Sequence, residues 1–406
     1  MPESAASALM PIDVALTQLL HDARQRIAGE TVALSQADGR IALDAVSAAC
    51  DVPPWNNSAM DGYAVDSACL EPEVPLFVSQ RVPAGIAPDR LRAGTVARIF
   101  TGAPMPEGAD AVVMQENCER DGENIKVIKP VIAGENVRNR GADVQQGSVL
   151  LPAGHRLRPQ DIGLLAATGQ PAVVVGRRPR VVLMATGDEL VEPGSALRPG
   201  QIYNSNVYTL AALLRVLGIE PLIVGRLPDS LAETEAALRS AAAQADCIIT
   251  SGGVSAGEED HVRTALQRCG QLAIWKLALK PGKPFAYGKI NNAVLFGLPG
   301  NPVSAFVTFL LLVRPALLAM MGASHCSLPE RHEKAGFALP ESGERQAYLR
   351  ACLHTGDGDR HLQLLPDQSS GVLSSVSRAD GLAIIPAFTS VAPGDQLRFL
   401  SFSDIV

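Results

Sequence analysis

Aromatic residues make up only 4% of the 406 residues, and acidic residues outnumber basic ones, giving a formal net charge of −7. Nucleic-acid-binding surfaces need a basic face and often use aromatic rings for stacking, so nucleic acid is not expected as a partner. No Gly-x-Gly-x-x-Gly follows a predicted strand, and Gly282-Lys283 is followed by Pro284 rather than Ser or Thr. A nicotinamide-binding fingerprint and a Walker A loop are therefore both excluded.

The seven cysteines are scattered, form no Cys-x-x-Cys pair and have no histidine at metal-ligand spacing. This pattern favours reduced thiols in the cytoplasm and predicts no zinc site. The N-terminus lacks a basic region followed by an apolar core, so no signal peptide is expected. The most apolar stretch, residues 303–321, is interrupted by Arg314-Pro315. It is expected to be a buried or interface helix rather than a membrane span.

The order of predicted elements indicates a multidomain α/β protein. From residue 179, strands alternate with helices, which predicts a doubly wound, mostly parallel sheet. Residues 74–140 read as all-β and are predicted to be inserted into a linking domain of helices and extended chain. Short strands after residue 329 predict a small C-terminal β-barrel or sandwich. The predicted domains are residues 1–50 with 141–178, then 51–140, 179–327 and 328–406.

Two glycine-rich loops follow predicted strands in the α/β part. The run Cys247-Ile248-Ile249 leads into Thr250-Ser251-Gly252-Gly253, and a later strand ends in Gly297-Leu298-Pro299-Gly300-Asn301-Pro302. Adjacent glycines let backbone N–H groups point toward an anion without a Cβ clash. Between the loops lie Lys276, Lys280 and Lys283. The pattern predicts a phosphate-binding pocket at the carboxyl edge of the sheet, the simpler alternative being tight turns.

Acidic residues also follow the predicted strands of this part. Asp188 and Glu189 follow one strand, Asp229 follows the next, and Glu258-Glu259-Asp260 comes after the first glycine-rich loop. Mg²⁺ is typically held by one or two carboxylates together with phosphate oxygens and water. The sequence therefore predicts a Mg²⁺ ion that bridges these carboxylates and the phosphates.

Three further loops are site candidates, each with a simpler structural alternative. The loop at residues 51–65 carries Trp55, Asp61 and Tyr63, and Asp61 either belongs to a site or caps a local turn. Thr101 ends a strand, where its hydroxyl either meets a phosphate or helps form a turn. Residues 138–143 contain two arginines and an aspartate, which form either part of a site or a solvated turn.

A polar stretch at residues 368–375 is more typical of a plain connection, although it could reach a ligand. It contains Ser369, Ser370 and Gly371 in succession. The histidines at positions 354 and 361 flank an Asp/Gly turn and are expected to be exposed.

Six motifs, in order along nearly the whole chain, resemble the bacterial molybdopterin molybdenumtransferase family, which is related to the C-terminal part of gephyrin. They are Asn57-Ser-Ala-Met-Asp-Gly-Tyr-Ala64, Phe100-Thr-Gly-Ala-Pro104, Ala185-Thr-Gly-Asp-Glu-Leu190, Ser251-Gly-Gly-Val-Ser255, Lys280-Pro-Gly-Lys-Pro284 and Leu298-Pro-Gly-Asn-Pro-Val-Ser304. The resemblance implies four domains and a Mg²⁺-dependent transferase. The implied reaction converts adenylated molybdopterin and molybdate into molybdenum cofactor and AMP.

The resemblance implies functional positions at Asp61, Thr101, Arg138, Asp143, Glu189, Asp229, Asp260, Lys276, Lys280, Pro299, Pro302 and Ser370, and the residue patterns described above add the other candidates. The catalytic candidates are Asp61, Thr101, Asp143, Glu189, Asp229, Asp260, Lys276 and Lys280, with Glu189 and Asp260 as the metal ligands. The cofactor-binding candidates are Arg138, Ser251, Gly252, Gly253, Ser255, Lys283, Pro299, Gly300, Asn301, Pro302 and Ser370.

A homodimer is implied as well, with each site shared between the β domain of one subunit and the α/β domain of the other. A transient contact with the adenylyltransferase that supplies the pterin would fit this role, and no membrane partner is expected. Two alternatives stay open. One is a non-catalytic molybdopterin-binding scaffold, and the other is a nucleotide pyrophosphatase or amidohydrolase sharing the α/β domain.

Overall fold

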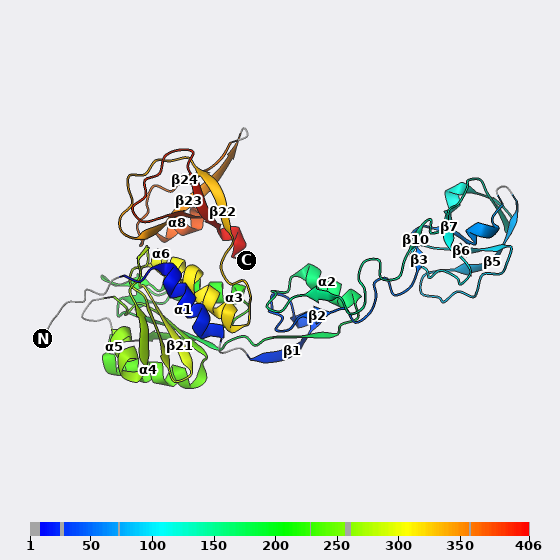
Figure 1. Cartoon of the computed structure of the whole chain (residues 1–406). Helices are drawn as coiled ribbons and strands as arrows, with labels where there is room; N and C mark the ends of the chain where they lie inside the picture. The colour runs from blue at the N-terminus through cyan, green and yellow to red at the C-terminus, as the bar shows by residue number, and fades with distance from the viewer. Residues whose placement is uncertain are drawn as a thin grey trace.

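A computed structural model describes residues 9–24, 28–71, 74–227, 229–255, 261–356 and 359–405. Its sheets fall into four parts, which we propose as the four domains. In Figure 1 the α/β part and the C-terminal part lie together at one end. The linking part forms the middle, and the all-β part lies at the opposite end. The chain is therefore elongated, and two of its site candidates lie at opposite ends.

The α/β part is built on a six-stranded sheet in the order β16-β13-β17-β21-β20-β18. Four neighbouring strands are parallel: β16 (Leu222–Leu227), β13 (Val181–Thr186), β17 (Cys247–Ser251) and β21 (Ala293–Leu298). The last two, β20 (Ala286–Ile290) and β18 (Gln271–Trp275), are antiparallel. The predicted mostly parallel sheet is confirmed, and β13, β17 and β21 are rich in apolar residues because both of their faces are covered.

Helices cover both faces of this sheet, as a doubly wound sheet requires. One face packs with α1 (Ile12–Arg24), α3 (Ser205–Val216), α6 (Pro302–Thr308) and α7 (Arg314–Met320). The other face packs with α4 (Leu231–Gln244) and α5 (His261–Cys269). Alternate residues of β13 point to the two cores, with Leu183 in the first and Met184 in the second.

One helical stretch within the described residues, Pro302–Met320, is long and apolar enough to span a membrane, but 94% of it is buried inside the protein. The expected buried helix is therefore confirmed. Arg314-Pro315 does not end it, because a π-helical turn at Phe309–Val313 precedes the proline. Such a turn offers the backbone an alternative hydrogen-bonding pattern where the proline supplies no N–H.

The linking part pairs β1 (Gly29–Ala33) with β12 (Ala172–Gly176), and β2 (Val46–Ser47) with β11 (Val149–Leu151). Its helix α2 (Pro159–Ala167) begins with proline, as helices often do, and with a charged capping box. Asp161, which is 4% exposed, accepts hydrogen bonds from the Arg158 backbone N–H (2.9 Å) and guanidinium (2.9 and 3.0 Å). These bonds, with help from His155, hold the pKa of Asp161 well below its usual range although burial opposes them.

We expect Asp161→Ala to destabilise α2 by about 2 kcal/mol at pH 7, because it removes a cap and leaves the buried end of the helix unpaired. Since the folded pKa of Asp161 is lowered, its contribution is complete above the unfolded value near 3.9 and is lost as the pH falls toward the folded pKa. Hydrogen exchange of the α2 amides should therefore be faster in the variant at pH 7, with a smaller difference at pH 3. Equal exchange rates at pH 7 would contradict this role.

The all-β part is a six-stranded sheet in the order β7-β4-β6-β5-β9-β8. Its strands are β4 (Gly62–Val65), β5 (Leu76–Val82), β6 (Thr95–Ile99), β7 (Ala111–Met114), β8 (Cys118–Asp121) and β9 (Asn124–Val127). The pair β3 (Asn57–Ser58) and β10 (Val137–Arg138) leads into it. The expected hairpin at Asp121-Gly122 joins β8 to β9.

The C-terminal part closes into the expected barrel, because β23 pairs with both β24 and β25. Its strands are β22 (Glu330–Ala335), β23 (Gln346–Gly356), β24 (Asp359–Leu364), β25 (Gly381–Ile385) and β26 (Gln396–Ser401). Strand β19 (Leu279–Lys280) of the α/β part adds to β23. The plain connection expected at residues 368–375 is wrong in its second half, where helix α8 (Leu373–Arg378) begins. Buried Val376 anchors this helix to the core. Of the two turn histidines, His354 is exposed and His361 is partly buried, with their rings stacked at 5.7 Å.

Candidate active site

A cavity of about 1010 Å³ lies at the carboxyl edge of the α/β sheet. The loops that follow β13, β17 and β21 line it, as does the beginning of α3. The barrel adds Gly371 and Leu373 to the wall. Ligands of open parallel sheets bind at this edge, so the cavity is the candidate site.

The two glycine-rich loops lie side by side along this cavity, because they follow the paired strands β17 and β21. Gly252 and Gly253 have φ angles of +92° and +70°, which favour glycine strongly. A Cβ on Gly252 would lie 2.7 Å from Thr186 Oγ1 and 2.9 Å from Thr186 O, so no larger residue fits there. Gly300 packs against Gly252, because a Cβ on Gly300 would lie 3.9 Å from the Gly252 Cα. The backbones of both loops can therefore approach a ligand in the cavity closely.

Two of the predicted carboxylates, Glu189 and Asp229, line the cavity. Asp188 next to them is paired with Arg226 (2.8 Å), and its backbone N–H donates to Asp229 Oδ2 (3.1 Å). The Asp188 carboxylate is therefore already used in an ion pair with Arg226, and Glu189 and Asp229 are the acids that line the cavity. Asp260, like Glu258 and Glu259, lies outside the described residues.

The remaining predicted cofactor-binding residues of the two loops also line the cavity: Ser251, Gly253, Ser255, Pro299, Gly300, Asn301 and Pro302. The Ser251 side chain is 3% exposed, and its hydroxyl bonds to Asn206 (2.7 Å) and more weakly to Pro299 O (3.5 Å). The Ser251 hydroxyl therefore connects its loop to α3 and to the second glycine-rich loop. The residues that follow Ser251 in its loop line the cavity.

None of the three predicted lysines is among the described residues that line the cavity. Lys276 has a φ angle of +64°, and its ammonium lies 5.3 Å from the ring centre of Trp275. Lys280 and Lys283 are exposed, and the Lys283 carbonyl accepts a hydrogen bond from Leu277 N (3.0 Å). Pro284, the residue after Lys283, does line the cavity, so of the three lysines Lys283 directly precedes a lining residue.

Ser370 and Arg350 connect the barrel to the cavity. Ser370 Oγ accepts a hydrogen bond from Asn301 (3.0 Å), and its carbonyl accepts one from Val303 N (3.1 Å). Arg350 is fully buried and donates to Ser375 Oγ (3.0 Å) and to the Ser369 carbonyl (2.9 Å). Its Nη1 is buried and has no hydrogen-bond partner within the described part of the chain.

Arg350 was missed in the sequence, although its place inside the apolar strand Ala347–Leu353 was a usable signal. Burial lowers the pKa of this guanidinium, and a buried cation without a carboxylate partner is costly. Such a group is well suited to bind an anion.

Three family models match the chain in order. They are the MoeA N-terminal region (domain I and II) at residues 10–169, a probable molybdopterin binding domain at 182–319, and the MoeA C-terminal region (domain IV) at 334–402. The molybdopterin molybdenumtransferase of Haemophilus influenzae is 41% identical over 98% of this chain and 100% of its own length. The chain belongs to the molybdopterin molybdenumtransferase family.

Other relatives support the same assignment. The family member from Nostoc sp. is 38% identical, covering 88% of this chain and 85% of that protein. The crystal structure of a molybdopterin biosynthesis MoeA protein from Pyrococcus horikoshii superposes with a TM-score of 0.81 at 32% identity, covering 97% of this chain and 99% of that one. The family's fold thus extends over the whole chain.

The candidate residues that the family resemblance gives in the N-terminal half lie far from this cavity within one chain. Asp61 immediately precedes β4, and its Oδ1 accepts hydrogen bonds from Thr101 N and Oγ1, each 2.8 Å. These bonds, together with the charge of Arg98, lower the pKa of Asp61. Arg138 on β10 and Asp143 are exposed. Figure 1 places β6, β7 and β10 at the end of the molecule opposite the α/β sheet, and β4 pairs with β6 and β7.

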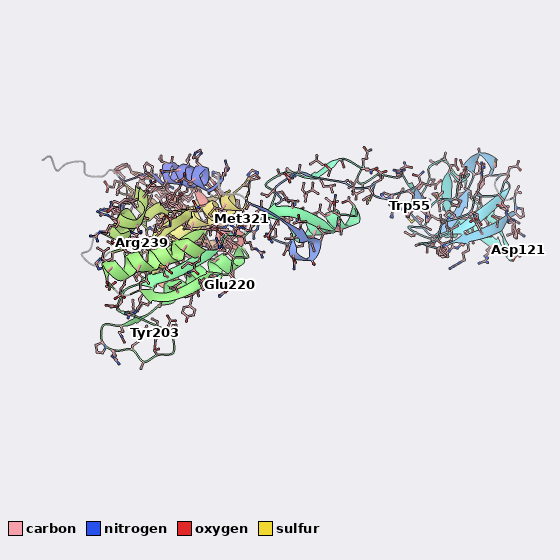
Figure 2. The ribbon with its side chains drawn as sticks, turned by 90° about the horizontal axis from the view of Figure 1, so that it is seen from below. Trp55, Asp121, Tyr203, Glu220, Arg239 and Met321 are labelled. Carbon is pink, nitrogen blue, oxygen red and sulfur yellow. The ribbon has the colours of Figure 1, made fainter. Side chains whose placement is uncertain are left out.

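Figure 2 gives the same picture from another side, with Trp55 at the root of the all-β part. Tyr203 lies at the other end, on a loop that projects from the α/β part and carries β14 (Leu190–Val191) and β15 (Ile202–Tyr203). Ile202 and Tyr203 are more than two-fifths exposed and also line the cavity. The larger cavity is therefore open to solvent on the side of this projecting loop.

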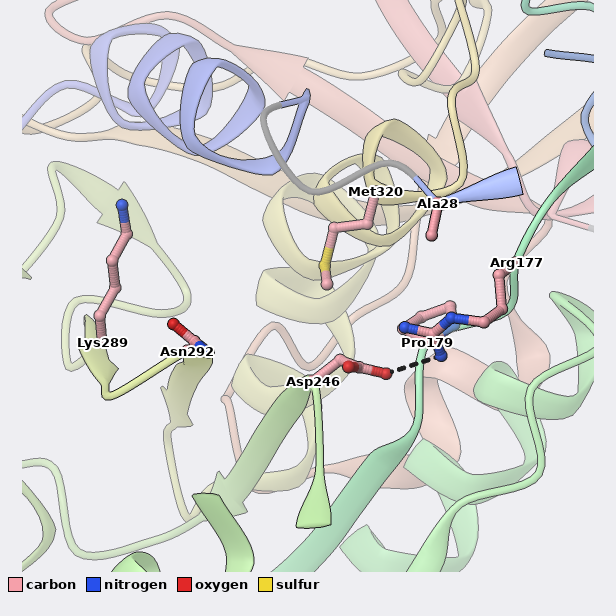
Figure 3. Close-up of a pocket in the computed structure, with 7 residues that line it drawn as sticks. All are labelled: Ala28, Arg177, Pro179, Asp246, Lys289, Asn292 and Met320. Carbon is pink, nitrogen blue, oxygen red and sulfur yellow. Dashed lines mark hydrogen bonds and ion pairs between the residues drawn. The ribbon is translucent and has the colours of Figure 1, made fainter. Parts of the chain in front are cut away.

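A second cavity, of about 380 Å³, lies at the amino edge of the same sheet (Figure 3). Its charged groups are already paired: Arg177 with Asp246 (2.9 Å) and Lys289 with Asp22 (3.1 Å). Burial raises the pKa of Asp246, but hydrogen bonds from Arg177 and Arg180 outweigh it and hold the pKa well below its usual range. This second cavity lies where the α/β part meets the linking part, and its charged groups already have partners. The larger cavity therefore remains the candidate active site.

The larger cavity fits a Mg²⁺ ion by its chemistry. Glu189 and Asp229 supply hard oxygen ligands, and Mg²⁺ completes its shell with water and phosphate oxygens. Among the described residues, no three His, Cys, Asp or Glu side chains are grouped closely enough to hold a metal without such help. A magnesium ion here would therefore depend on the substrate's phosphates.

Proposed function

We propose that this chain transfers molybdenum from molybdate to adenylated molybdopterin, forming molybdenum cofactor and releasing AMP at the larger cavity. That the protein is an enzyme of the molybdopterin molybdenumtransferase family rests on its full-length relatives. The adenylated form of the substrate, the Mg²⁺ ion and the shared site are our proposals. The observation that supports them best is that two glycine-rich loops and two carboxylates converge on one open cavity.

The glycine-rich loops would bind the phosphates of the substrate. The Gly253 amide and the amino terminus of α3 would present partial positive charge to the cavity, whereas the Gly252 N–H is already bonded to the Leu298 carbonyl. Lys276, Lys280 and Lys283, which the sequence predicts for this role, would reach the pyrophosphate by rotation of their flexible side chains. Positive groups that neutralise the phosphates also reduce the repulsion between pyrophosphate and molybdate, both of which are anions.

Glu189 and Asp229 would hold Mg²⁺, with Asp260 as the further ligand that the sequence predicts. When bound, the ion supplies charge neutralisation at the phosphoanhydride and helps AMP leave. Arg350 and Ser370 would bind molybdate, since Arg350 has an unpartnered buried Nη1 and donates to the Ser369 carbonyl, and Ser370 is bonded to the cavity-lining Asn301. Asn301 would hold Ser370 in place for this role.

Asp61, Thr101, Arg138 and Asp143 would act in the site of a second subunit. The all-β part of one chain lies too far from its own cavity in this structure to reach it (Figure 1). A homodimer brings the two together, because symmetry gives each cavity the same partner surface.

One assay tests the proposed reaction. Purified protein is incubated with adenylated molybdopterin, molybdate and Mg²⁺, and both AMP and active molybdenum cofactor are measured, the latter by reconstitution of a molybdenum-free enzyme. We expect both products together, and neither after chelation of Mg²⁺ with EDTA. Active cofactor formed without AMP, or an unchanged rate in EDTA, would contradict the proposal.

A further inference from the structure

Asn206 makes a contact that no motif in the sequence indicates. It is the second residue of α3, and its side chain lines the larger cavity. The Nδ2 group lies 2.7 Å from Ser251 Oγ and 2.7 Å from Gly300 O. One side-chain amide therefore connects the beginning of α3 to both glycine-rich loops, and each of its two hydrogens has an acceptor.

The two loops have few other ties between them. Gly252 N donates to Leu298 O (3.0 Å) at the base of the loops, and the Ser251 hydroxyl lies 3.5 Å from Pro299 O. Beyond these contacts the loops meet through glycines, which have no side chains to hold them in register. Among the described residues, the Asn206 amide thus makes the shortest side-chain hydrogen bonds that join the two loops.

Asn206 is not needed to begin the helix. The cap of α3 is Asn204, which is 2% exposed and whose side chain accepts from Val207 N (3.4 Å). Asn204 therefore already accepts a hydrogen bond from one of the backbone N–H groups that have no partner within the helix. Both hydrogens of the Asn206 amide point instead to the loops, so a capping role does not account for this side chain.

We propose that Asn206 is a positioning residue for the phosphate-bearing end of the pterin substrate. By holding Ser251 and Gly300 at fixed distances, it sets the spacing of the backbone amides on both loops. Preorganised donors bind an anion tightly only when they are held in place before the ligand arrives. This inference rests on the proposed function of the cavity, and it adds a residue whose role is exerted through the two loops.

The test compares Asn206→Ala with Thr209→Ala as a matched control. Thr209 is one turn further along α3, and its hydroxyl bonds only to the Ser205 carbonyl (3.2 Å). We expect Asn206→Ala to weaken the equilibrium binding of adenylated molybdopterin about 10- to 30-fold, as the loss of two hydrogen bonds predicts. Thr209→Ala should bind within about twofold of wild type, since its one hydrogen bond stays within α3 and touches neither loop. Melting temperatures of both variants should stay close to the wild-type value.

A double-mutant cycle separates positioning from general damage. If Asn206 acts partly through Ser251, the affinity loss in the Asn206→Ala/Ser251→Ala variant should be clearly smaller than the product of the two single losses. Wild-type affinity in Asn206→Ala, or losses that multiply fully in the double variant, would overturn the inference. If instead the wild-type protein itself fails to bind adenylated molybdopterin, the proposed function fails and not the role of Asn206.

Discussion

Gly252→Ala is expected to reduce AMP release at least about 100-fold. The new methyl group would lie 2.7 Å from Thr186 Oγ1 and 2.9 Å from the Thr186 carbonyl, so the loop after β17 or the end of β13 must move. A displacement of about 1 Å in a binding loop is enough to cost this much in rate. The φ angle of +92° adds strain of about 1–3 kcal/mol. The variant should therefore fold less stably and also lose the geometry of the site.

Gly225→Ala is the matched control for this variant. Gly225 lies on β16 of the same sheet at a φ angle of +85°, but a Cβ there meets no atom within 4 Å. It should show a similar loss of stability from backbone strain while keeping AMP release within about twofold of wild type. If both variants lost activity equally, strain in the sheet and not the clash at the loop would be the cause. Rates are compared per folded protein, as judged by the thermal unfolding curve of each variant.

The elements of the α/β part could be predicted because their signals are local. Apolar runs such as Cys247-Ile248-Ile249 mark strands buried on both faces, and glycines or Asn204 mark where they end or where helices begin. Strand β22 is not predictable from its own residues, because five of its six residues in a row are charged or histidine. Buried Glu333 on this strand is paired with Arg360 of β24, and that partner lies 27 residues away along the chain. Such a pairing becomes visible only in the fold.

The candidate site was predictable in its residue types but not in its spatial arrangement. The glycine-rich loops and the acids after the strands were expected to meet because parallel strands end at one edge. Asn206 could not be identified in this way, since its contacts lie 45 and 94 residues away. The orientation of the lysines could not be predicted either. Lys276 follows Trp275 at a positive φ angle, and this local conformation places its ammonium near the indole ring.

A second large loss of AMP release is expected from two variants that alter opposite ends of the molecule. Asp61→Ala alters the all-β end, and Asp229→Ala alters the cavity. Each variant on its own should lose at least about 100-fold of its AMP release, as removal of a charged site group typically does. Neither variant should unfold the protein, because both side chains lie away from the hydrophobic cores.

Co-expression of these two variants tests whether each site is shared between subunits. A mixed dimer has one site carrying both substitutions and one site carrying neither, so it should have half the wild-type activity. Random pairing makes half of the dimers mixed, so the population should recover about a quarter of the wild-type rate. AMP release should be measured on the mixed dimers after separation by two different affinity tags. Half of the wild-type rate per mixed dimer is the result we predict, and no recovery above the two single variants would contradict a site built from two chains.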